Sequence, residues 1–178
     1  IAGTLLVTGS ISSSSLVSVP AAAQLGGTGT LGAVSVASGG VLVPGTSIGT
    51  LSSGNLTMTS GAIFEVEVND AGQGDKLVVT GTVALGGATL SVLETGAFAG
   101  VDPFNYLIID NDGADAVGGT FGSIVNQLAF LTPTVAYDAG DGNDVRLRLT
   151  PNNATGVDAR WLLNPGSGDW NTAGNWDP

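Results

Sequence analysis

The sequence contains neither cysteine nor histidine among its 178 residues. Their absence excludes disulfide bonds, catalytic machinery built on cysteine or histidine, and the tetrahedral zinc sites that these side chains form. An active site would have to use carboxylate, hydroxyl or lysine chemistry. No apolar run is long enough for a transmembrane helix. The opening residues also lack a basic segment followed by an apolar core, so we expect no signal peptide here.

Basic residues are scarce, because four Lys and Arg face fifteen Asp and Glu, for a formal net charge of −11. This balance argues against a nucleic-acid partner or an anionic membrane surface. The charge is also unevenly placed, since residues 1–64 carry none and the first charged residue is Glu65. Serine, threonine and asparagine must therefore supply the solvent-facing polarity of that segment.

Glycine, in contrast, contributes 29 residues, and hydrophobic residues make up 43% of the chain. That apolar share is too high for a polar disordered segment. Apolar residues alternate with polar or small ones, as in Leu56/Met58 and Phe64/Val66/Val68. A period of two indicates β-strands, and no convincing helical stripe is present.

Three alternating segments recur at solenoid spacing. They begin at Val34, Leu56 and Val83, which are 22 and 27 residues apart, and each runs into a turn of small residues. A unit of this size cannot bury its own apolar face and must stack on its neighbours. The sequence therefore predicts an all-β parallel β-helix (β-solenoid), less regular toward the C-terminus, with a continuous apolar core.

Composition divides the chain into three predicted parts. Residues 1–95 are predicted to form regular solenoid rungs. Residues 96–150, where aromatic and acidic residues appear, are predicted to form wider rungs with a closing hairpin at Asp138–Asp144. Residues 151–178 are predicted to be a linker or the start of a further repeat module. Because Ile1–Val7 opens in an apolar strand pattern, we expect end-to-end contact with another module or copy.

Glu65 and Glu67 lie two residues apart on a predicted strand, so their carboxylates project from the same face. Paired carboxylates can catalyse glycoside hydrolysis. The simpler interpretation is a solvent-facing pair that alternates with buried apolar residues. We therefore expect no catalytic residues in this chain.

Two acidic runs with glycines, at 110–115 and 138–144, are weak calcium candidates. Calcium takes six to eight oxygen ligands, and these runs concentrate carboxylates. The candidate ligands are Asp110, Asp112, Asp115, Asp138, Asp141 and Asp144. Turns rich in Gly, Asn and Asp explain both runs without a metal, so we expect no cofactor and keep calcium as the alternative.

The segment 27–51, GTGTLGAVSVASGGVLVPGTSIGTL, resembles passenger domains of bacterial autotransporters (type V secretion) with autotransporter-associated β-strand repeats. Residues 64–81 and 119–133 continue the pattern, so the resemblance covers most of 1–150. It implies a right-handed parallel β-helix and secretion by an outer-membrane translocator outside this sequence. It also implies a place at the bacterial cell surface or outside the cell, adhesion or scaffolding as the commonest role, and no shared catalytic residues.

We therefore expect a non-catalytic extracellular surface protein, a β-helical shaft for adhesion or for cell-surface or filament structure. Its expected partners are host or neighbouring-cell surfaces, matrix or glycans, but not nucleic acid. The alternative is a carbohydrate-binding or polysaccharide-degrading β-helix protein that uses carboxylates. Trp161, Trp170 and Trp176 could form a sugar platform, although we favour a role at a junction between modules.

Overall fold

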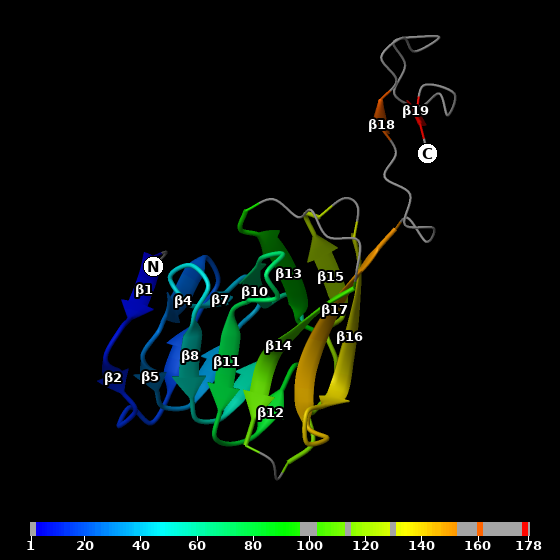
Figure 1. Cartoon of the computed structure of the whole chain (residues 1–178). Helices are drawn as coiled ribbons and strands as arrows, with labels where there is room; N and C mark the ends of the chain where they lie inside the picture. The colour runs from blue at the N-terminus through cyan, green and yellow to red at the C-terminus, as the bar shows by residue number, and fades with distance from the viewer. Residues whose placement is uncertain are drawn as a thin grey trace.

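The fold is built from strands alone in the part of the chain that the computed structural model describes (Figure 1). The described residues are 3–96, 103–112, 115–128, 131–152, 160–161 and 176–177. Three sheets, here named A, B and C, receive successive strands of the chain in turn. A separate antiparallel pair joins Arg160–Trp161 (β18) to Trp176–Asp177 (β19).

The strands of the three sheets follow one another in strict rotation up to β14. Sheet A contains Gly3–Val7 (β1), Ala23–Gly27 (β4), Val41–Pro44 (β7), Ile63–Val68 (β10), Thr89–Glu94 (β13) and Ser123–Asn126 (β15). Sheet B contains Ser10–Ile11 (β2), Thr30–Leu31 (β5), Thr50–Ser53 (β8), Lys76–Val79 (β11), Phe104–Asn111 (β14), Asp144–Pro151 (β17) and Leu131–Ala139 (β16). Sheet C contains Val17–Val19 (β3), Val34–Val36 (β6), Leu56–Met58 (β9) and Val83–Ala84 (β12).

One strand from each sheet makes one turn of the chain, which we call a coil. Coil 1 is β1–β3, coil 2 is β4–β6, coil 3 is β7–β9 and coil 4 is β10–β12. The ladders that join neighbouring strands among β1–β13 are all parallel. The predicted parallel pairing of the first 95 residues is thus confirmed for these strands, and the connectivity is consistent with a β-solenoid.

The register of the strands shows that the coils lengthen from the second coil onward, since partners are 17 residues apart at Gln24↔Val41 and 22 apart at Val41↔Ile63. Partners in sheet A are 20 residues apart at Gly3↔Ala23, 26 apart at Ile63↔Thr89 and 34 apart at Thr89↔Ser123. Much of the added length lies at the corner between sheets A and B. Two residues separate β1 from β2 there, five separate β7 from β8, and seven separate β10 from β11.

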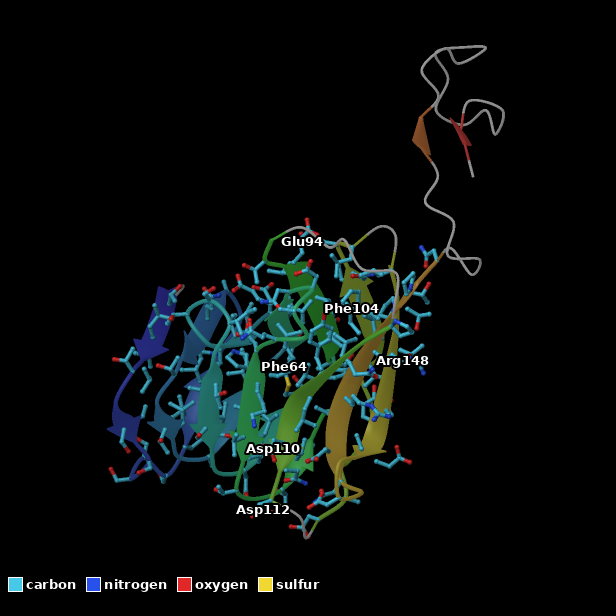
Figure 2. The ribbon with its side chains drawn as sticks, viewed as in Figure 1. Phe64, Glu94, Phe104, Asp110, Asp112 and Arg148 are labelled. Atoms are coloured by element: carbon cyan, nitrogen blue, oxygen red, sulfur yellow. The ribbon has the colours of Figure 1, made fainter. Side chains whose placement is uncertain are left out.

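All three sheets contribute side chains to the core, and in sheet A these form a column of apolar residues stacked in register. Each strand contributes one member, and the members are Leu5, Leu25, Leu42, Phe64, Leu90 and Ile124. The four inner members are at most 1% exposed, whereas Leu5 is 50% and Ile124 36% exposed. Within β10, the alternation predicted from the sequence is confirmed, because Phe64, Val66 and Val68 are fully buried. Figure 2 shows Phe64 inside the stack.

The corner between sheets C and A repeats one hydrogen-bonded turn. The backbone N–H of Gly40 donates to Ala37 O, and that of Ala62 donates to Thr59 O, both at 2.9 Å. Successive corners are also bonded to one another, since Gly39 N donates to Gly61 O at 2.8 Å. The small residues of this corner therefore allow the backbones of adjacent coils to approach closely enough to pair.

The parallel order of sheet B ends at an antiparallel hairpin. Strand β17 pairs antiparallel with both β14 and β16, and the β16–β17 turn lies between Ala139 and Asp144, within the segment predicted to form a hairpin. Aromatic rings pack at this end of the core: Phe121 lies 6.0 Å from Phe64 and 6.2 Å from Tyr137 between ring centroids. The boundaries at 95 and 150 remain predictions, and most of 151–178 lies outside the described residues.

Gly29 and Gly9 give a matched test of the stacking, because they occupy equivalent corners of coils 2 and 1. A Cβ atom on Gly29 would lie 2.1 Å from Gly9 O, whereas one on Gly9 would meet nothing within 4 Å. We predict that Gly29→Ala lowers the free energy of unfolding by about 2–4 kcal/mol, since the coils would be forced apart. Gly9→Ala should change it by less than about 0.5 kcal/mol. Equal losses in denaturant unfolding would contradict the stacked corner.

Candidate functional site

The paired carboxylates predicted from the sequence lie on the outer face of strand β10. Glu65 and Glu67 are partly exposed and alternate with the buried side chains of that strand. Ser91 of the adjacent strand donates a hydrogen bond from Oγ to Glu65 Oε2 at 3.3 Å. The predicted common face is therefore present, and a serine of the next coil contacts one of the two carboxylates.

A third carboxylate, Asp75, lies close to this pair and was not singled out by the sequence analysis. It directly precedes β11 and is only 1% exposed. Its Oδ1 accepts a hydrogen bond from Gly49 N at 2.8 Å, and its Oδ2 accepts one from Glu67 N at 2.9 Å. Asp75 thereby joins the corner of coil 3 to a strand of coil 4.

The environment of Asp75 favours its neutral form. Burial raises the pKa of Asp75 from 3.8 to about 7, although the N–H groups of Glu67 and Gly49 oppose the shift. The negative charges of Glu67 and Glu65 make smaller contributions to the same rise. Perturbed carboxyl groups occur at catalytic sites, but they also occur in purely structural hydrogen-bond networks.

The loop that leads to Asp75 is held by Asn69 and Tyr106. Asn69 Oδ1 accepts hydrogen bonds from Ala71 N at 3.1 Å and Gln73 N at 2.9 Å, which closes the loop on itself. The Tyr106 hydroxyl, from β14, donates to Asn69 O at 2.7 Å. Burial, together with the charge of Asp70, raises the pKa of Tyr106, so this phenol remains a neutral donor.

The six calcium candidates do not come together as one site. Asp110 is engaged by Lys76, whose Nζ lies 2.8 Å from Asp110 Oδ2 on the adjacent strand. Asp144 Oδ1 accepts a hydrogen bond from Asn111 N at 2.9 Å, which links the two acidic runs. Within the described part of the chain, however, no group of three or more acidic side chains could hold a metal ion. Figure 2 shows Asp110 and Asp112 at the opposite edge of the stack from Glu94.

The tryptophan platform is only partly described. Trp161 and Trp176 are backbone partners in the β18–β19 pair. Trp170 lies outside the described residues. The choice between a sugar platform and a junction between modules therefore remains a prediction.

A shallow hollow of about 200 Å³ lies between β1, β3 and β4. Its walls include the exposed Leu5 of the first coil and the buried core residues Val19 and Leu25. No acidic residue lines it. The hollow therefore continues the core and is separate from the carboxylates of the A–B corner.

No protein-family model matches the chain, and no curated protein matches it either. The described residues also contain no helix with the length and apolarity needed to cross a membrane. The resemblance to autotransporter passengers thus depends on the residues quoted for it.

The hydroxyl of Tyr106 provides a test of how the A–B corner is held. Tyr106→Phe removes the donor to Asn69 O, so we predict a loss of about 1 kcal/mol in the local stability of the 69–75 loop. Amide hydrogen exchange at Asn69 and Gln73 should accelerate about fivefold. Tyr137→Phe serves as the control, because it removes the acceptor of Phe121 N instead. Equal acceleration by both variants would contradict a local role of Tyr106.

Proposed function

We propose that this chain is a non-catalytic extracellular surface protein, a β-helical shaft for adhesion or for cell-surface or filament structure. The observation that supports this proposal is the in-register stack of coils. Because of this register, outward-facing residues of successive coils lie directly above one another along the molecule. On sheet C these positions hold Ser18, Ser35 and Thr57, one above the other. Such a surface suits many weak polar contacts, which multiply through avidity when modules are linked.

The proposed fold is a right-handed parallel β-helix, as in autotransporter passengers. Each coil is a connection between parallel strands of one sheet, and such connections are right-handed in about 98% of cases. The resemblance over 27–51 supports a location at the bacterial cell surface or outside the cell, reached through an outer-membrane translocator. A net charge of −11 is compatible with a soluble rod and with partners other than nucleic acid.

The proposed partners are host or neighbouring-cell surfaces, matrix or glycans, together with further modules or copies in end-to-end contact. The exposed leucines of β1 support the second kind of contact, since Leu5 is 50% and Leu6 57% exposed. An edge strand also presents unpaired N–H and C=O groups that a further strand can bond.

A carbohydrate-binding or polysaccharide-degrading protein that uses carboxylates is the second candidate. The observation that favours it is the raised pKa of Asp75 beside Glu65 and Glu67. Against catalysis, both oxygens of Asp75 already accept backbone hydrogen bonds, and its side chain is almost completely covered. For either function we propose no resident cofactor, with calcium at the two acidic runs as the alternative.

A polysaccharide panel distinguishes the two candidates. We predict no release of reducing sugar or unsaturated product from any member, and adhesion to cells or matrix that survives the double change Glu65→Gln and Glu67→Gln. The same changes should alter the free energy of unfolding by less than about 0.5 kcal/mol, because both side chains are on the surface. Cleavage of a polysaccharide that disappears in the double variant would establish the enzymatic alternative instead.

A further inference from the structure

Two of the four basic residues of the chain project from one strand of sheet B. Arg146 and Arg148 are both exposed on β17, where they alternate with the buried Val145, Leu147 and Leu149. Side chains two residues apart on a strand share a face, at a spacing of about 7 Å. The outer surface of the sheet therefore displays two guanidinium groups side by side. Figure 2 shows Arg148 at the hairpin end of the stack.

Neither guanidinium group is engaged by an acidic side chain within the described part of the chain, where the ion pair is that of Lys76 with Asp110. The other acidic residues of the same three strands, Asp138 and Asp144, lie at the β16–β17 turn, and Asp110 lies on β14 near that end. Arg148 is farther from that turn than Arg146. In a chain with fifteen acidic residues, two exposed arginines that pair with none of those described are available to an external anion.

The strands on either side place polar side chains in register with Arg148. Asn105 of β14 and Thr134 of β16 lie directly opposite it on the outer face, and both are exposed. Thr134 Oγ1 donates to Arg148 O at 3.5 Å, so its lone pairs can still accept a hydrogen bond. Guanidinium, amide and hydroxyl groups thus form one row across three strands.

A second row, through Arg146, combines the other guanidinium group with small apolar surfaces. Leu107 and Ala136 are the partners of Arg146 across the sheet, and both are partly buried. Together the two rows make a surface that we call the arginine platform, which consists of Asn105, Leu107, Thr134, Ala136, Arg146 and Arg148.

We propose that the arginine platform binds anionic polysaccharides, whose sugar units carry carboxylate or sulfate groups. A guanidinium group can hold a carboxylate through two parallel N–H donors, and Asn105 and Thr134 can bond sugar hydroxyls. An extended polymer can lie across an open sheet face without needing a cavity. The inference rests on the proposed function, because it names the chemical class among the proposed glycan partners.

The same features argue against other anionic partners. Proteins that bind DNA strongly make on the order of six to ten phosphate contacts, whereas the platform offers two basic groups. A protein partner would favour an apolar centre, and the apolar side chains here are partly covered. The net charge of −11 repels polyanions at long range, but charges beyond about 8 Å are largely screened at physiological salt. Contacts at the platform itself therefore decide binding.

Isothermal titration calorimetry of the whole chain with polygalacturonate, dextran sulfate and neutral dextran tests the platform. We expect binding to one or both polyanions, which identifies the carboxylate or the sulfate as the group bound, and none to dextran. Arg148→Gln should weaken binding about tenfold, since it removes a charge-assisted hydrogen-bonded contact. Lys76→Gln makes the same change of charge on the same sheet and should weaken binding about twofold or less.

Arg148→Lys is a second variant that keeps the charge but removes the two-pronged donor, so its affinity should fall between those of the unmodified chain and Arg148→Gln. Absence of binding to both polyanions, equal binding to dextran, or equal weakening by Arg148→Gln and Lys76→Gln would overturn the platform. Self-association that Arg148→Gln abolishes, without polysaccharide binding, would overturn it in favour of an acidic surface on a second copy. Adhesion of the chain to cells without binding to either polyanion would overturn the platform alone and leave the proposed function standing.

Discussion

Parallel backbone pairing between coils is the constraint on which the rest of this structure depends. Each strand must place its residues directly over those of the strand before it, about 4.8 Å away. Apolar side chains consequently stack into columns, and any charged group inside the columns would lack a partner. Residues 1–64 contain no charge, and the inner members of the Leu5–Ile124 column are fully buried or nearly so. The corners must be equally compact, as the close approach of Gly29 to Gly9 O illustrates.

Much of the fold could be predicted from the sequence because it is encoded locally. Alternation placed Phe64, Val66 and Val68 on the inner face, and the separations of Val34, Leu56 and Val83 agree with the pairing of β6, β9 and β12. The division of the strands among three sheets could not be predicted. It depends on how sharply each corner turns, and the corner lengths change from two to seven residues along the chain.

The candidate site was less accessible to sequence analysis, because its members meet through pairing between coils. Asp75 precedes a strand and reads as an ordinary turn residue, and nothing local indicates that Gly49, 26 residues earlier, donates to it. The Glu65 and Glu67 pair was visible because it requires only the period of one strand. Asp110 is a second example: it stands in an acidic run that suits a turn or a calcium loop, and nothing local indicates that its carboxylate bonds to Lys76, 34 residues away.

Dipolar electron spin resonance between two spin labels tests the stacked coils most directly, and the cysteine-free chain makes labelling specific. Thr4, Thr89 and Ser123 lie on one in-register row of sheet A, with Thr89 four strands and Ser123 five strands from β1. The account predicts backbone separations of about 19 Å for the Thr4–Thr89 pair and about 24 Å for the Thr4–Ser123 pair. Separations that fail to increase by one strand spacing, or that come in the reverse order, would contradict it.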